Sequence, residues 1–300
     1  MALRDQTLTS VKVYLGFHRL CLATGTAFVY AQNDQRYLVT NWHNVTGRNS
    51  LTHKHLSTQA SIPNRLVAVC PIYHDGDRTS PQATLFWEVL NIRLYEDDGS
   101  PCWYEHPSHG SLVDVAAIPI GAPSPRSALI CVNDQRVTFA NQAVGAGTDA
   151  FVLGYPHGLS GGAKLPIWKR GSIASEPQAD IDGLPKVLID ASTRRGMSGS
   201  PVFAHVEGLS FPVGSTDLGD GILGSTFQFM GCYSGSLGRE PFEAQLGVLW
   251  KERAIIEIIA AQHKGPPSAD LFERDASPGT THEAFDWNDW GNLPELPKIT

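Results

Sequence analysis

Short segments in which apolar and polar residues alternate recur along most of this chain, and turn-forming residues separate them. Leu90, Ile92 and Leu94, for example, alternate with polar residues, which places their side chains on one face of a strand. Glycine and proline supply 29 and 20 of the 300 residues, so turns are frequent. Many short strands of this kind predict antiparallel barrels or a sandwich rather than a parallel βαβ sheet.

The same patterning locates the expected elements. A turn at 97–100 predicts a hairpin between residues 90–94 and 102–104. Near the end of the chain, apolar residues recur with helical spacing and predict a helix over about 251–262. We expect the other strands at 26–30, 37–40, 66–71, 113–119, 151–154, 187–189, 201–205, 229–233 and 245–250.

Charge and cysteine content narrow the function classes. The formal net charge is −7, whereas binding a nucleic-acid backbone requires a basic face, so we expect no nucleic-acid partner. The first residues are polar and no apolar stretch approaches 18 residues, so we expect a soluble, cytoplasmic protein without a membrane partner. The five cysteines are scattered and include no CxxC pair, which predicts reduced thiols rather than a zinc site or disulfides.

The composition changes after the expected helix. Residues 264–300 are rich in proline and glycine and contain seven acidic residues against three basic ones. We therefore expect an acidic C-terminal tail over 264–300, appended to a globular region over 1–263.

Three polar residues have sequence neighbours that suit a catalytic role. Ser198 lies between Gly196 and Gly199, and such small neighbours leave a hydroxyl open to a carbonyl and backbone N–H groups free to face an oxyanion. His43 follows an apolar strand at a strand-to-turn junction. Asp114 is flanked by apolar residues, where a carboxylate needs donors such as an imidazole N–H. Taken singly, each has an ordinary structural explanation as a turn residue, a core histidine or a hydrogen-bonded acid.

Read together in chain order, His43, Asp114 and Ser198 resemble the triad of the chymotrypsin-like (trypsin-fold) serine proteases. The surrounding blocks resemble most closely the bacterial HtrA-type trypsin-like peptidase branch, although Asn44 and Thr46 depart from its pattern after the histidine. These blocks are 25–29 (GTAFV), 38–43 (LVTNWH), 114–116 (DVA), 152–158 (VLGYPHG), 171–175 (GSIAS), 190–192 (DAS), 196–201 (GMSGSP) and 231–235 (GCYSG).

The resemblance covers about residues 20–262 and implies an all-β fold. It implies two antiparallel six-stranded β-barrels, at about 10–125 and 126–250, followed by the C-terminal helix. The interval of 71 residues between His43 and Asp114 is longer than is usual in the family, and we attribute the excess to an insertion within 53–108. Residues 264–300 are too few and too rich in proline to resemble a PDZ domain.

The resemblance also implies roles for individual residues. In a serine endopeptidase of this family, His43 takes the proton of Ser198 Oγ and Asp114 orients the imidazole. The backbone N–H groups of Gly196 and Ser198 match the oxyanion hole. Ser192 matches the floor of the specificity pocket, while Gly235 and Gly247 match its walls. An uncharged floor predicts medium-sized apolar or uncharged side chains at the cleaved residue.

The implied partners are a protein or peptide substrate, with no cofactor and no metal. Met197 stands where digestive members carry an aspartate that pairs with a newly cut N-terminus, so activation by that cleavage is not expected. We expect instead that a loop, the tail or an activating or restraining protein partner orders the oxyanion hole around 195–197.

Three alternatives have different sequence requirements. An α/β-hydrolase esterase needs its acid and histidine after the serine, and Gly199-Ser200 does not fit its G-x-S-x-G motif. A metal hydrolase lacks support because no HExxH occurs and His53 and His55 are the closest histidine pair. A non-catalytic trypsin-fold binding or scaffold protein stays open, because the sequence does not establish an accessible pocket.

Overall fold

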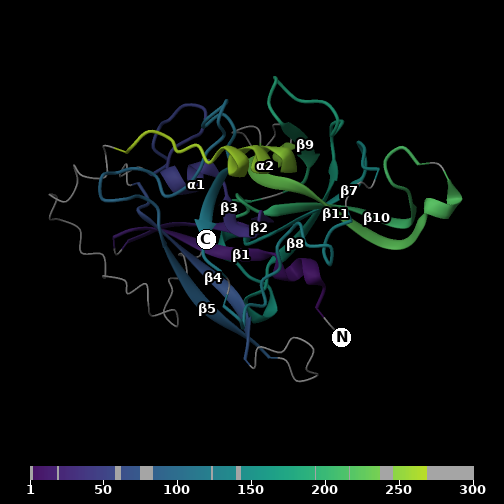
Figure 1. Cartoon of the computed structure of the whole chain (residues 1–300), viewed down its shortest axis with the longest axis horizontal. Helices are drawn as coiled ribbons and strands as arrows, with labels where there is room; N and C mark the ends of the chain where they lie inside the picture. Colours follow the sequence, from purple (N-terminus) through teal and green to yellow (C-terminus); the bar gives the residue numbers. More distant parts are fainter. Residues whose placement is uncertain are drawn as a thin grey trace.

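The computed structural model describes residues 3–268 except 19, 58–61, 75–83, 123, 140–142, 193, 216 and 237–245. Within this part, twelve strands form two antiparallel six-stranded sheets, which Figure 1 shows next to each other. The first sheet, in the order β5-β4-β1-β2-β3-β6, contains β1 (Ser10–Phe17), β2 (Leu20–Gln32), β3 (Gln35–Thr40), β4 (Arg65–Tyr73), β5 (Leu85–Arg93) and β6 (Ala116–Ile120). The second sheet closes into a barrel, in the order β10-β11-β12-β9-β8-β7, from β7 (Asp149–Gly154), β8 (Ile167–Ile173), β9 (Lys186–Asp190), β10 (Pro201–Ser210), β11 (Ile222–Ser236) and β12 (Leu246–Lys251).

Alternation in the sequence explains how a strand such as β1 is buried. Val11, Val13 and Leu15 point to one side and join an apolar cluster of the first sheet. Tyr14 points to the other side, against Val67 of β4. Both faces of β1 are therefore covered, as its central position between β4 and β2 requires.

Helices are few and short in the described part. They comprise α1 (Trp42–Thr46), α2 (Glu252–Ala261) and the 3₁₀ turns Asp5–Leu8, Pro156–Gly158, Gly162–Lys164 and Leu218–Asp220. The predicted helix over 251–262 is confirmed by α2, whose apolar face, including Ile255 and Ile258, is buried. Because α2 contacts β6 of the first sheet as well as β11 and β12 of the second, it packs across the junction of the two sheets.

An apolar cluster joins the two sheets. Phe28 of the first sheet meets Phe229 of the second edge to face, with ring centroids 5.4 Å apart. Ile255 of α2 belongs to the same cluster. A separate cluster, which includes Val152, Met197 and Tyr233, fills the second barrel. The two sheets are therefore fixed against each other by a common core.

The prediction of an all-β fold with two six-stranded sheets is confirmed, with three differences in detail. The first sheet is open in the described residues, with β5 and β6 at its edges, so its closure into a barrel stays a prediction. β1 and β8 were not among the predicted strands. The predicted hairpin is confirmed only close to its turn. Beside the bridge between Tyr95 and Pro101, the Cys102 N–H donates to the Leu94 carbonyl at 2.9 Å and the Glu96 N–H donates to the Ser100 carbonyl at 2.8 Å, whereas β5 itself pairs with β4.

Two further observations concern membranes and thiols. No helix among the described residues has the length and apolar character needed to cross a membrane. All five cysteines are free thiols.

Candidate active site

The histidine of the site lies in the first turn of a short helix. Asn41 is extended, α1 begins at Trp42, and Gly47 ends the helix in the left-handed conformation with its N–H bonded to the His43 carbonyl at 2.9 Å. Asn41 Nδ2 also donates to the backbone carbonyl of Asp114 at 2.7 Å. This bond ties the start of α1 to the segment that carries the acid.

Asp114 lies just before β6 and accepts three hydrogen bonds. Its carboxylate contacts His43 Nδ1 at 2.7 Å, the His43 backbone N–H at 2.9 Å and Ser234 Oγ at 2.5 Å. Because an ionised carboxylate only accepts, Nδ1 carries the proton of the neutral ring and Nε2 keeps its lone pair. Ser234 belongs to β11 of the second sheet, so residues of both sheets hold the acid. The His43 ring is thereby oriented as a general base requires.

Burial and charge set the protonation of this pair. Burial by itself lowers the pKa of His43, but the negative charge of Asp114 and its hydrogen bond outweigh burial and raise that pKa above its ordinary value. Burial opposes ionisation of Asp114 too, yet His43, Ser234 and the backbone N–H bring its pKa below the ordinary value. Burial and the nearby Asp114 raise the pKa of the Cys232 thiol well above its ordinary range. Cys232 therefore stays a neutral thiol beside the pair.

Ser198 lies in the loop between β9 and β10, and hydrogen bonds fix this loop on two sides. From the first sheet, Thr26 N–H donates to the Ser198 carbonyl at 3.0 Å, and Thr26 Oγ1 donates to the Gly196 carbonyl at 2.8 Å. From the second sheet, the Tyr233 carbonyl accepts from the Gly199 N–H at 2.9 Å. The serine is thus positioned through the backbone groups of its own loop, at the junction of the two sheets.

Two glycines allow the loop its close approach to neighbouring backbone. Gly196 and Gly199 have φ values of 90° and 86°, in the left-handed region. A Cβ on Gly196 would lie 2.3 Å from the Tyr155 carbonyl oxygen, and one on Gly199 would lie 2.0 Å from the Thr26 carbonyl oxygen. Among the described residues, no acceptor bonds the N–H of Gly196 or of Ser198. Both N–H groups can therefore donate to a further acceptor.

His43 and Ser198 line one cavity of about 330 Å³, together with Asp114 and Ser234. A Cβ on Gly235 would lie 3.9 Å from Ser198 Oγ, so β11 runs directly beside the hydroxyl. The hydrogen bonds of the described residues do not include one between Ser198 Oγ and the His43 ring, and such contacts commonly tighten only when substrate binds. The apolar part of the wall consists of Leu51, Leu56, Leu112, Leu184, Val248 and Trp250.

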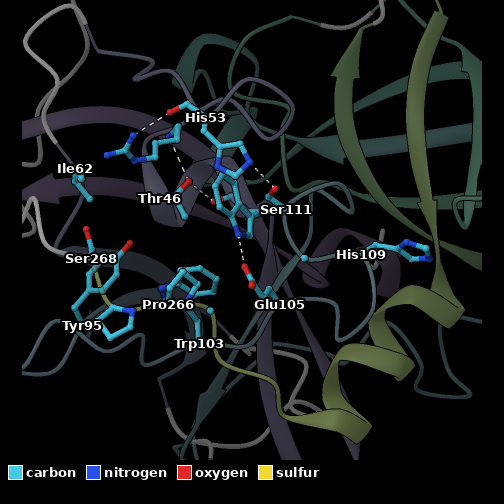
Figure 2. Close-up of a pocket in the computed structure, with 15 residues that line it drawn as sticks. Thr46, His53, Ile62, Tyr95, Trp103, Glu105, His109, Ser111, Pro266 and Ser268 are labelled. Atoms are coloured by element: carbon cyan, nitrogen blue, oxygen red, sulfur yellow. Dashed lines mark hydrogen bonds between the residues drawn. The ribbon is translucent and has the colours of Figure 1, made fainter.

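A second cavity, of about 470 Å³, lies beside Trp42, the residue before His43. Figure 2 shows Glu105 and Trp103 on its wall, and Glu105 Oε2 accepts a hydrogen bond from Trp42 Nε1 at 2.7 Å. His43 and Ser198 do not line this cavity, so it is separate from the candidate site. Across the described residues, no three His, Cys, Asp or Glu side chains are arranged to hold a metal ion.

Two of the predicted pocket residues, Ser192 and Gly247, are not among the described residues that line the cavity beside His43 and Ser198. Ser192 is exposed to solvent, while Gly247 lies on β12 with the ring of Tyr233 against it. Gly235 lines this cavity. The pocket roles of these three residues stay predictions.

Two residues that sequence reasoning did not single out contribute to the site. Ser234 bonds Asp114 from 120 residues away, and Thr26 bonds Gly196 from 170 residues away. Both lie in blocks that resemble the protease family, 231–235 and 25–29, which was the available signal. Their partners are distant in sequence, so no local pattern could identify the bonds they form.

Comparison with known proteins gives one match at the level of sequence families. The model of the trypsin-like peptidase domain matches residues 25–209, well over half of the chain. No curated protein sequence matches the chain.

Solved structures resemble the fold at low sequence identity. The Rv3671c protease of Mycobacterium tuberculosis, in its active form, is 17% identical, with 88% of this chain and 84% of that chain covered and a TM-score of 0.45. The serine endoprotease from Yersinia pestis is 14% identical, with 87% and 66% covered and a TM-score of 0.46. The HtrA-type protease AlgW with tripeptide is 10% identical, with 87% and 63% covered and a TM-score of 0.45.

Proposed function

Because the chain belongs to the trypsin-like peptidase domain family, we propose that it is a serine endopeptidase with His43, Asp114 and Ser198 as its catalytic triad. The family supports a protease that acts on peptides or proteins. The finer assignment rests on one observation: His43, held by Asp114 on the first sheet, lines the same cavity as Ser198 from the second. That arrangement provides a base and a hydroxyl in chain order His, Asp, Ser.

The first half of the proposed reaction forms an acyl-enzyme. Ser198 Oγ attacks the scissile carbonyl carbon while His43 Nε2 takes its proton, and the negative charge of Asp114 stabilises the imidazolium. The carbonyl oxygen becomes an oxyanion that accepts hydrogen bonds from the Gly196 and Ser198 N–H groups. The C–N bond then breaks, and the leaving amine takes the proton from His43.

The second half reverses these roles with water. His43 Nε2 takes a proton from a water molecule, whose oxygen attacks the ester carbonyl of acylated Ser198. The oxyanion forms against the same two N–H groups, and its collapse breaks the ester bond. The proton on His43 returns to Ser198 Oγ, which restores the free enzyme.

Other features of the proposal follow the family. We infer that the first sheet corresponds to the first barrel of the family, and that Ser192, Gly235 and Gly247 surround the specificity pocket. A cytoplasmic location without nucleic-acid or membrane partners stays a prediction from composition, which fractionation of producing cells would test.

Regulation belongs to the proposal as well. The side chain of Met197 is uncharged and fully buried in the second barrel, so it offers no ion-pair partner to a new N-terminus. We propose that a loop, the tail or a protein partner restrains or activates the loop around 195–197. Removing residues after Ser268 tests the tail and keeps its N–H bond to the Gly99 carbonyl (3.0 Å). Unchanged ester hydrolysis in the truncated protein would remove the tail from this role.

Labelling with a fluorophosphonate probe tests the function. The wild type should form a covalent adduct that peptide mass spectrometry assigns to Ser198, and Ser198→Ala should abolish it. Ser234→Ala is the matched control, because Ser234 lines the same cavity but serves Asp114, so this variant should still label at a lower rate.

Two results would overturn the proposal. Adduct formation that survives Ser198→Ala would assign the nucleophile to another residue. A wild type that neither labels nor hydrolyses small esters would favour the non-catalytic binding protein.

A further inference from the structure

Three backbone segments meet at the end of the second barrel beside Ser198. Strand β12 pairs with β9 at Gly247 and Ile189, and with β11 at Gly247 and Ser236. Gly235, which precedes Ser236, lies next to Ser198 Oγ. When a substrate carbonyl is bound at Ser198, the side chain of that substrate residue would therefore enter the barrel end beside Gly235 of β11 and the start of β12.

Tyr233 occupies this space. A Cβ on Gly247 would lie 2.4 Å from Tyr233 Cε2, 2.9 Å from its Oη and 3.1 Å from its Cζ. Tyr233 is completely buried, in the apolar cluster that also contains Met197 and Leu249. The space beside Gly247, which has no side chain, is thus filled by the ring of Tyr233 and is closed to a substrate side chain.

The backbone of Tyr233 is fixed to the nucleophile loop. Its N–H donates to the Ser200 carbonyl at 2.9 Å, and its carbonyl accepts from the Gly199 N–H at 2.9 Å. The next residue, Ser234, bonds Asp114. Tyr233 cannot withdraw to admit a large side chain without disturbing the segment that positions both Ser198 and Asp114.

The cavity beside Ser198 agrees with a filled pocket. Its described wall includes Gly235 and Val248 but neither Ser192 nor Gly247. Ser192 and Gly247, which would form the deep part of the pocket, therefore do not line the cavity. Gly235, which lies next to the Ser198 hydroxyl, does line it.

We propose that Tyr233 closes the primary specificity pocket and limits the residue before the scissile bond to glycine, alanine or serine. This inference depends on the proposed endopeptidase function and makes its substrate class more specific. The inferred preference for small side chains replaces the medium-sized side chains that an uncharged pocket floor predicted at the cleaved residue. An apolar pocket discriminates by about 10–200-fold for each methylene that it fails to fit, so exclusion of a leucine-sized side chain should be strong.

The experiment compares peptide p-nitroanilides that differ only in having alanine, leucine or phenylalanine before the cleaved bond. The wild type should show a kcat/KM for alanine about 100-fold or more above that for leucine. Tyr233→Val, which shortens the side chain, should lower this ratio at least about tenfold. Tyr233→Phe is the matched control, because it keeps the ring and should keep the ratio. A ratio measured on one sample does not depend on how much of that sample is folded.

The outcomes separate this inference from the proposed function. A wild type that labels at Ser198 and cleaves the leucine substrate as fast as the alanine substrate would overturn the inference and leave the function intact. An unchanged ratio in Tyr233→Val would do the same. If neither variant folds, the wild-type substrate panel decides alone. Absence of labelling in the wild type would overturn the function, and the inference with it.

Discussion

The two sheets hold their parts of the site by different physical means. On the first sheet, Asp114 and His43 are joined by side-chain hydrogen bonds, and the acid side chain is only 5% exposed. On the second sheet, hydrogen bonds to the backbone groups of the loop and close contacts at Gly196 and Gly199 set the position of Ser198. The His43–Asp114 half thus depends on charge and proton positions, whereas the Ser198 half depends on backbone shape.

This difference predicts how each half fails. A substitution that removes a polar atom from the Asp114 network should change pKa values and rates while the backbone stays in place. A substitution that adds atoms to the Ser198 loop should displace the N–H donors whatever its polarity. The predictions below test this contrast from the largest expected effect to the smallest.

Asp114→Asn should lower kcat about 10⁴-fold, because the amide no longer fixes the productive tautomer of His43. Loss of the nearby negative charge should also lower the pKa of His43. Ester hydrolysis measured over a range of pH checks both effects. A decrease of less than tenfold would show that the charge of Asp114 is not needed.

Gly196→Ala should lower kcat about 10²–10³-fold, the usual effect of losing one oxyanion donor. The added Cβ would lie 2.3 Å from the Tyr155 carbonyl oxygen, so the backbone at residue 196 must rotate away from that oxygen and take its N–H group with it. Gly147→Ala is the matched control, since Gly147 has a φ of 88° but open space where its Cβ would stand. If the two variants lose the same activity, backbone strain alone explains the effect and the donor role is wrong.

Ser234→Ala should lower kcat/KM about tenfold, corresponding to about 1.4 kcal/mol for a lost hydrogen bond to a charged group. Asp114 keeps its two bonds from His43, so the effect should be smaller than that of Asp114→Asn. Ser10→Ala, which removes a buried serine bond to the Leu153 carbonyl, controls for stability. Equal rates in the two variants would remove Ser234 from the network.

The smallest expected effect is a shift in the pH profile of the wild-type activity. His43 acts as a base only when neutral, so activity falls as pH decreases through its pKa. Because Asp114 raises that pKa, the acid limb of kcat/KM should have its midpoint above about 6.5, the usual value for histidine. A midpoint below that value would show that burial outweighs the charge of Asp114.

Much of the fold could be predicted from the sequence because its signals are local. Alternation located most strands, and helical spacing located α2. The hairpin at 90–104 is shorter than predicted and β5 pairs with β4, because alternation shows that a strand exists but not which strand it pairs with. Pairing of β5 with β4 depends on contacts across the sheet, and these are not encoded in either segment alone.

The sequence by itself determined the strand-rich class, the order of His43, Asp114 and Ser198, and the glycines around the serine. Only the tertiary structure decided which groups meet: Ser234 on Asp114, Thr26 on the serine loop, and Tyr233 in the space beside Gly247. The physical reason is that periodicity and turn chemistry act over a few residues, whereas these contacts join segments brought together only by the packing of two sheets.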